Sequence, residues 1–211
     1  FINNGVQTVD LSADFRLPIE LYESTYETKH PYPSLIEKFT YGLPELNREK
    51  IKSSDFIANP GCFPTCSTIP LIPLIEKNIK NIIVDAKTGI SGAGRSKKID
   101  HSFSEISDNF SAYSLDGHRH EPEIENNLNF KLHLTTHLSP MTRGIFSTIY
   151  FPSTNGLVLC ISHISGNITP PLIPILKILE LTDLFSPAKN IGITPFSELC
   201  TLKLLILFFF K

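Results

Sequence analysis

A candidate nucleophile occurs in the stretch NPGCFPT, where Cys62 directly follows a Pro-Gly pair and precedes an apolar run that predicts a helix. A cysteine at a helix N-terminus faces unpaired backbone N–H groups and the positive end of the helix dipole, which both favour thiolate over thiol. We therefore expect a lowered pKa for Cys62, with the same N–H groups available to a later oxyanion. The alternative is a buried structural cysteine, as we interpret Cys66, Cys160 and Cys200.

A second cluster of reactive side chains lies in SLDGHRHEPEI, where His118 and His120 flank Arg119. Imidazoles beside a guanidinium can act as a general acid or base next to an anion clamp, although a solvated helix cap would contain the same residues. An HxH pair can also bind metal, but the sequence has no HExxH motif, no CxxC pair and no suitably spaced further ligand. We therefore expect no metal site.

A glycine-rich loop, SGAGR, follows a predicted strand. Its backbone N–H groups, with Arg95 alongside, offer a site for a phosphate. A plain turn is the alternative, because short Gly-Ser loops are common.

Alternating strand and helix patterns surround these residues. Residues 8–11 and 55–58 have the pattern of strands, and residues 19–26 that of a short helix. Residues 65–78 have apolar residues at helical spacing, although Pro70 and Pro73 would kink the helix. A strand, a turn and a helix with cysteine at the turn predict an α/β fold.

Composition excludes several classes of partner. The chain has 211 residues, of which 41% are hydrophobic and 19% are charged, as is typical of a globular protein with a sizeable core. A net charge of -2 argues against binding nucleic acid or an anionic membrane surface. The apolar run LLILFFF is far shorter than the ~18 residues that cross a bilayer. Four cysteines without a CxxC pair favour a reduced, cytoplasmic setting.

Six stretches of the sequence resemble one enzyme family, N-acetyl-gamma-glutamyl-phosphate reductase of arginine biosynthesis. In chain order they are VDLSADFRL, YGLPELNRE, NPGCFPT, KTGISGAGR, AYSLDGHRHEPEI and THLSPMTRGIFSTIY. The resemblance covers residues 1 to about 150. The six stretches together are far harder to obtain by chance than any one of them.

The resemblance implies a two-domain plan, similar to that of aspartate-semialdehyde dehydrogenase and glyceraldehyde-3-phosphate dehydrogenase. Residues 1–61 would be the C-terminal part of a dinucleotide-binding Rossmann domain, and residues 62–165 an α/β catalytic and dimerisation domain. Residues 166–211 diverge from the family and receive no assignment. The complete protein would be a homo-oligomer.

The resemblance also implies a reaction. Cys62 would attack the acyl phosphate of N-acetylglutamyl 5-phosphate, release phosphate and form a thioester that NADPH reduces to the semialdehyde. His118 would be the acid/base group, with His120 as the second choice. The substrate is a small molecule and the cofactor is NADP.

Further residues receive binding roles from the same resemblance. Ser91, Gly92 and Gly94 would lie near the nicotinamide end of the cofactor. Arg119 and Arg143 would hold the phosphate or the carboxylate of the substrate.

Two departures from the family pattern lead to alternatives. No GxxGxxG-type pyrophosphate loop precedes Phe1, and LLILFFFK stands where the family has a helix that returns to the Rossmann domain. We therefore expect a fragment that is not a working NADPH-dependent reductase by itself, or an inactive remnant of the enzyme. A cysteine hydrolase that uses Cys62 and His118 is a third interpretation, although the flanking stretches match a dehydrogenase.

Overall fold

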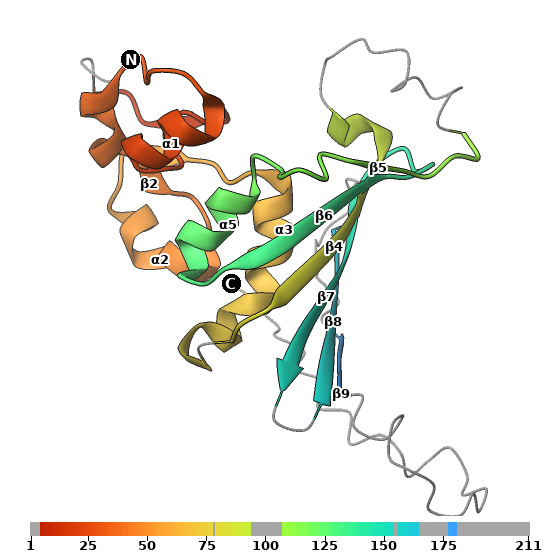
Figure 1. Ribbon diagram of the computed structural model, residues 1–211. Helices are drawn as coiled ribbons and strands as arrows, with labels where there is room; N and C mark the ends of the chain where they lie inside the picture. The colour runs from red at the N-terminus through yellow and green to blue at the C-terminus, as the bar shows by residue number, and fades with distance from the viewer. Residues whose placement is uncertain (1–4, 78, 94–106, 154–155, 165–176, 181–211) are drawn as a thin grey trace, which may run out of the picture. The chain divides into compact units, whose positions relative to one another are not determined.

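The protein divides into two compact units (Figure 1). The computed structural model describes residues 5–77, 79–93, 107–153, 156–164 and 177–180. The first unit joins residues up to Asn78 with Ser114–Phe130, and the second joins Ile79–Tyr113 with the residues from Lys131 onward. Both units combine helices with strands, which confirms the α/β fold class.

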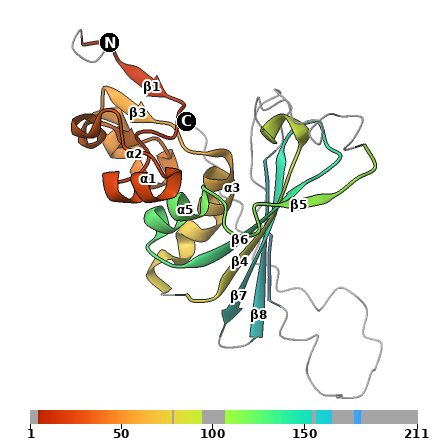
Figure 2. The same ribbon diagram turned by 45° about the horizontal axis from the view of Figure 1, so that its top comes forward.

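The first unit contains a small parallel sheet with the strand order β1-β3-β2; its strands β1 and β3 are seen side by side in Figure 2. Helical segments connect the strands and return the chain to the edge of the sheet where each strand begins, so the strands run parallel. Its strands are β1 (Thr8–Asp10), β2 (Thr40–Tyr41) and β3 (Phe56–Ala58). Its helical segments are α1 (Ile19–Tyr26), η2 (Pro33–Lys38), α2 (Pro44–Lys52), α3 (Cys62–Leu71), η3 (Ile72–Lys77) and α5 (Glu121–Leu128). The strands predicted near residues 8 and 55 and the helix at 19–26 are confirmed.

The carboxyl ends of the three parallel strands meet at one edge of this sheet. The Asn59 N–H donates to the Asp10 carbonyl at 2.8 Å, and the Gly42 N–H donates to the Ala58 carbonyl at 2.8 Å. These bonds extend the ladder just past the last strand residues. The turn that leads into Cys62 therefore starts from backbone that is held on both sides.

Helices α3 and α5 supply most of the apolar core beside this edge. Phe63 and Leu71 of α3 are 3% and 0% exposed, and Ile124 and Leu128 of α5 are 0% and 1% exposed. The helix predicted after Cys62 becomes a 3-10 segment at residue 72, just after its internal proline. A proline cannot donate the N–H that an α-helix needs, so the change falls where the sequence predicts a kink.

The second unit contains a six-stranded mixed sheet with the order β5-β6-β4-β7-β8-β9. β4 is parallel to β6, and the other neighbouring pairs are antiparallel. Ile82, Val84, Ala86 and Thr88 alternate along β4 and are buried, as expected for a strand with one covered face. The elements are β4 (Ile82–Thr88), η4 (Ile90–Ala93), β5 (Ser111–Tyr113), β6 (Leu132–Leu138), β7 (Ile145–Ser153), β8 (Gly156–Ile164) and β9 (Lys177–Glu180).

The two compact units are not divided at residue 61, where the family resemblance places the boundary between the two domains. α3 and α5 belong to the same unit as the parallel sheet, and they contact each other there. The functional assignment of residues 1–61 and 62–165 stays a prediction. Of residues 166–211, the structure describes β9 alone.

Within the described ranges, no helix has both the length and the hydropathy that a membrane crossing requires.

Candidate active site

Cys62 is the first residue of α3 and is exposed to solvent. The preceding residue, Gly61, is the helix N-cap and has extended backbone angles of φ -64 and ψ 158. Both the N–H and the hydroxyl of Thr65 donate to the Gly61 carbonyl, at 3.0 and 2.9 Å. The backbone N–H groups of Cys62 and Phe63 at this helix start favour the thiolate and so act to lower the pKa of Cys62.

The predicted lowering of the Cys62 pKa is nevertheless wrong. The sulfur lies close to enough protein atoms to lose hydration, although the residue is exposed, and this desolvation raises the pKa of Cys62. The two backbone N–H groups and Arg16 lower it without outweighing desolvation, and Glu123 raises it further. The expectation considered the turn alone, whereas the charged neighbours come from other segments.

His118 and His120 both lie beside the start of α3. Their ring centroids are 4.9 Å apart, and the edge of Phe63 contacts both rings, at 5.1 and 6.0 Å between centroids. Phe63 directly follows Cys62. The structure thus brings both candidates for the single acid/base histidine and the predicted nucleophile into one part of the first unit.

A backbone hydrogen bond selects the tautomer of His118. The His120 N–H donates to Nδ1 of His118 at 3.1 Å, so Nδ1 is an acceptor and the neutral ring carries its proton on Nε2. Burial lowers the pKa of His118 to about 4, with a further contribution from Arg119. His118 is therefore neutral near pH 7 and holds one proton that it can donate.

His120 is more deeply buried, at 7% exposure, and lies against the backbone of Gly61. A Cβ added at Gly61 would be 2.9 Å from Nε2 of His120, so glycine is required for this close approach. Burial lowers the pKa of His120 to about 3, and His118, Arg119 and Arg16 add to this lowering. Within the described part of the chain, His120 Nδ1 has no hydrogen-bond partner.

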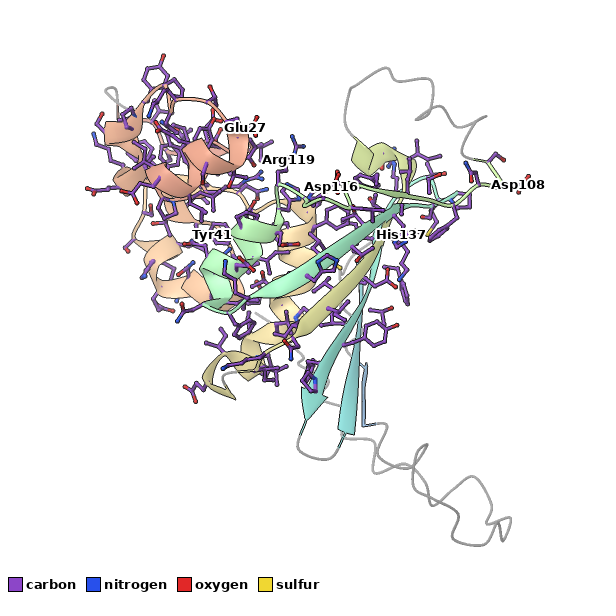
Figure 3. All side chains as sticks on the ribbon, in the orientation of Figure 1. Glu27, Tyr41, Asp108, Asp116, Arg119 and His137 are labelled. Atoms are coloured by element: carbon purple, nitrogen blue, oxygen red, sulfur yellow. The ribbon has the colours of Figure 1, made fainter. Side chains whose placement is uncertain are left out.

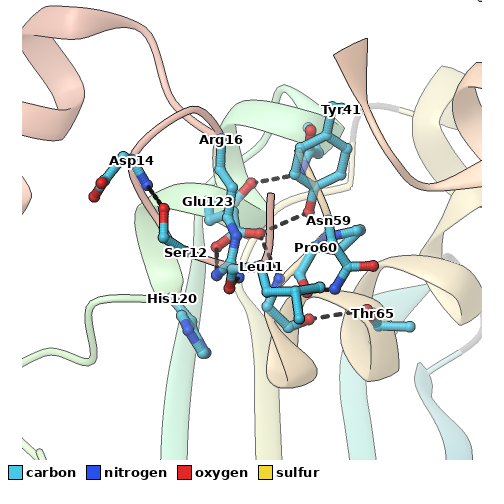
Figure 4. A network of polar contacts seen from close by, with 12 residues as sticks. Leu11, Ser12, Asp14, Arg16, Tyr41, Asn59, Pro60, Thr65, His120 and Glu123 are labelled. Carbon is cyan, nitrogen blue, oxygen red and sulfur yellow. Dashed lines mark hydrogen bonds and ion pairs between the residues drawn. The ribbon is translucent and has the colours of Figure 1, made fainter. Parts of the chain in front are cut away.

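Glu123 is a central residue of this site that the sequence reasoning missed (Figure 4). Its side chain is 1% exposed, and Oε1 accepts hydrogen bonds from the Gly61 N–H at 2.9 Å and from the Tyr41 hydroxyl at 2.8 Å. Arg16 Nη1 lies 3.5 Å from Glu123 Oε2. Burial raises the pKa of Glu123, while Gly61, Arg16 and Tyr41 lower it. The signal available in the sequence was that Arg16, Tyr41 and Glu123 all lie in stretches that carry the family resemblance.

The side chain of Arg16, in the loop after β1, is only 8% exposed. Its Nη2 donates to the Leu11 carbonyl at 2.9 Å, and its guanidinium faces Glu123. The loop after β1 therefore turns inward and places a positive charge beside a buried carboxylate.

The two arginines that the resemblance assigns to the substrate lie in different units. Arg119 is exposed and stands next to both histidines in the chain (Figure 3). Arg143 is exposed in the turn between β6 and β7 of the second unit. Their roles toward phosphate or carboxylate stay predictions.

The glycine loop after β4 does not form a phosphate cradle at its described residues. The N–H groups of Ile90, Ser91 and Gly92 donate to the carbonyls of Met141, Thr142 and Gly89, at 2.8, 3.1 and 3.0 Å. A phosphate would find these three donors already used, which corrects the expectation that they bind one. Gly94 and Arg95 lie outside the described residues.

The described part of this loop still fits the nicotinamide end of a cofactor. Ser91 and Gly92 are both exposed, so a hydroxyl and a small backbone surface face solvent. Such a surface can contact a flat ring or its amide without a charged donor. The predicted role of these residues is thus compatible with the structure only at that end.

The free energy of unfolding is expected to fall as the pH is lowered from 6.5 toward 4. An unfolded histidine titrates near 6.5, whereas folding lowers the pKa of His118 to about 4 and of His120 to about 3. Below pH 6.5 the unfolded chain therefore binds up to about two more protons than the folded chain, so acid favours unfolding.

Urea unfolding of the 211-residue chain between pH 7 and pH 5 measures this slope. The matched control is the double variant His118→Asn/His120→Asn, which should show a flatter dependence. An equal slope in the two proteins would contradict the assignment of the two buried neutral rings.

Among the residues that the structure describes, no group of three or more His, Cys, Asp or Glu side chains is arranged to hold a metal ion.

Comparison with known proteins supports the recognition made from the six stretches. Residues 62–159 match the family described as "Semialdehyde dehydrogenase, dimerisation domain". A protein of Magnetococcus marinus named N-acetyl-gamma-glutamyl-phosphate reductase is 45% identical over 166 residues, which cover 74% of this chain and 48% of that protein. One of the same name from Geotalea daltonii is 49% identical over 161 residues, or 71% of this chain and 46% of that protein.

Among solved structures, aspartate semialdehyde dehydrogenase II of Vibrio cholerae aligns with a TM-score of 0.49 and 17% identity, over 72% of this chain and 50% of that one. The chain spans about half the length of the curated relatives that it matches. The resemblance is confirmed as a similarity: about seven tenths of this chain is similar in sequence to proteins named N-acetyl-gamma-glutamyl-phosphate reductase, and residues 62–159 match the semialdehyde dehydrogenase dimerisation domain family.

Proposed function

We propose that this chain supplies the catalytic residues of an NADPH-dependent reductase of N-acetylglutamyl 5-phosphate. The products are N-acetylglutamate 5-semialdehyde and phosphate. The observation that carries the proposal is the position of Cys62 at the start of α3, with two histidine rings against the neighbouring Phe63. The names of the relatives support the same reaction class.

Cys62 is the nucleophile in this proposal. The Cys62 thiol first loses its proton to solvent; the thiolate Sγ then forms a bond to the carbonyl carbon of the acyl phosphate, the bond from that carbon to the phosphate oxygen breaks, and phosphate leaves with the electron pair. A thiol suits this step because the resulting thioester accepts hydride readily and the thiolate is expelled afterwards. The N–H groups of Cys62 and Phe63 stabilise negative charge as it develops at the helix start.

His118 is the proposed acid. Its neutral ring has the proton on Nε2, because Nδ1 accepts the His120 N–H. Nε2 would protonate the hemithioacetal oxygen and take the proton back when the aldehyde forms. Exposed Arg119, adjacent in the chain, would hold an anionic group of the substrate.

The cofactor in this proposal, NADPH, supplies the hydride that reduces the thioester. Ser91 and Gly92 would contact its nicotinamide end through their exposed surface, since their N–H groups are already bonded within the protein. The family described as a dimerisation domain supports a homo-oligomer as the working form, and we propose a cytoplasmic location.

Acyl transfer tests this proposal without the cofactor. The chain is mixed with N-acetylglutamyl 5-phosphate, quenched in acid and examined by intact mass and peptide mapping. One N-acetylglutamyl group on the Cys62 peptide, with a matching single release of phosphate, is the expected result. No adduct, or an adduct on another cysteine, would refute the nucleophile, and continuous phosphate release would favour the hydrolase alternative.

Native alkylation is expected to modify Cys62 before Cys66. Cys62 is exposed, whereas Cys66 is 1% exposed in the core of the same helix. The raised pKa of Cys62 leaves little thiolate at neutral pH, so its rate should increase up to and beyond pH 8. Iodoacetamide labelling followed by peptide mapping measures both rates, and faster labelling of Cys66 would contradict the described packing of α3.

A further inference from the structure

The N-cap of α3 depends on a side chain from another helix. Gly61 has no side chain with which to cap the helix, and no side-chain cap bond is present at this end. Glycine is also the residue with the greatest backbone freedom, so its extended conformation must be held from outside. The Gly61 N–H donates to Glu123 Oε1 at 2.9 Å, in a fully buried bond between segments that are 62 positions apart.

The carboxylate that receives this bond is itself held from two further segments. The Tyr41 hydroxyl, at the end of β2, donates to the same oxygen at 2.8 Å. Arg16, in the loop after β1, lies 3.5 Å from the other oxygen. Oε1 therefore accepts two hydrogen bonds and Oε2 faces a positive charge. A buried carboxylate requires such partners, and they leave it few alternative orientations.

We propose that Glu123 is a positioning residue for the nucleophile: by holding the Gly61 N–H it fixes the turn from which Cys62 and the first N–H groups of α3 face the substrate. The proposal rests on Cys62 as the proposed nucleophile. Glu123 acts through Gly61 and makes no bond to the reacting atoms. With Gly61 held, the first turn of α3 keeps its place, and its Cys62 and Phe63 N–H groups continue to favour the thiolate.

Two neutral substitutions distinguish the hydrogen bond that Glu123 accepts from Gly61 from the effect of its negative charge on the pKa of Cys62. Glu123→Gln keeps an oxygen acceptor for Gly61, whereas Glu123→Leu removes it, and both remove the negative charge that raises the pKa of Cys62. We expect Cys62 in the leucine variant to react with iodoacetamide about three- to tenfold more slowly than in the glutamine variant, the range set by one hydrogen bond. Tyr41→Phe, which leaves the Gly61 bond in place, should change the rate about twofold or less.

Cys66 reports on the alternative that Glu123 merely stabilises the fold. It lies on the same helix and is 1% exposed, so it is labelled only if the helix loosens. Slower labelling of Cys62 in the leucine variant than in the glutamine variant, with Cys66 still protected from labelling, supports the proposal. Equal Cys62 rates in the two variants, or accelerated labelling of Cys66 in the leucine variant, would overturn it.

A second variant guards against an unfolded leucine protein. Glu123→Leu leaves Arg16 buried beside an apolar group, so Arg16→Met/Glu123→Leu removes the unpaired charge as well. In the double variant, Cys62 should be labelled as slowly as in the leucine variant. A labelling rate equal to that of the glutamine variant would contradict the proposal. The outcome is independent of the acyl-transfer test, because alkylation needs neither substrate nor cofactor.

Discussion

Cys62→Ser is expected to reduce reductase activity by about 10³-fold or more. Serine keeps the shape of the side chain and the two N–H groups at the helix start. Its hydroxyl, however, is a far weaker nucleophile than a thiol at neutral pH and would form an oxygen ester that resists hydride. The measurement is turnover of N-acetylglutamyl 5-phosphate by a chimera in which this segment replaces the matching part of the Magnetococcus marinus relative.

Cys66→Ala in the same chimera is the matched control. Cys66 is buried, four residues further along α3, and belongs to the core instead of the surface that meets substrate. It should keep most of the activity while losing some stability. Substantial turnover in the Cys62 variant would exclude a covalent mechanism and with it the proposed function.

His118→Asn is expected to lower turnover by about 10²- to 10⁴-fold, the usual contribution of a general acid or base. The amide oxygen can still accept the His120 N–H, so the local turn is retained while the Nε2 proton is lost. Cofactor binding should change little. The measurements are kcat and KM for the chimera, together with its affinity for NADPH.

His120→Asn identifies which histidine carries the proton. If His118 is the acid, the His120 variant should lose less turnover, with its main effect on the packing against Gly61. A large loss for His120 with little change for His118 would move the acid/base role by two positions. Loss of NADPH binding in either variant would contradict a role confined to the chemistry.

Local patterns predicted the elements of this site but not their contacts. β1, β3 and α1 are encoded in consecutive residues, and so is the turn that starts α3, which is why the sequence predicts them. The pairing of Gly61 with Glu123 joins residues far apart in the chain, and no periodicity reports it. The pKa of Cys62 was wrongly predicted for the same reason, because desolvation is a property of the packed site.

The glycine loop is a second case in which the sequence predicts a local structure but not its contacts. Its composition is that of a phosphate-binding turn, and the sequence alone cannot show where its N–H groups point. In the fold, the carbonyls of Met141 and Thr142, in the connection between β6 and β7, accept hydrogen bonds from two of those N–H groups. A glycine-rich motif therefore indicates a tight turn reliably and a ligand only when its donors are left free.

The two-piece construction of the first unit has a consequence for the order in which the protein assembles. During synthesis, Cys62 and the whole parallel sheet emerge before the segment Ser114–Phe130, which carries both histidines and Glu123. Closing a loop of this length has an entropic cost that must be met before its contacts stabilise the chain, so docking of α5 is a late step. Until then the nascent chain carries the cysteine without the two histidines and Glu123. A chain interrupted after Asn78 would keep the thiol, Arg16 and the start of α3 but lack the carboxylate that accepts the Gly61 N–H.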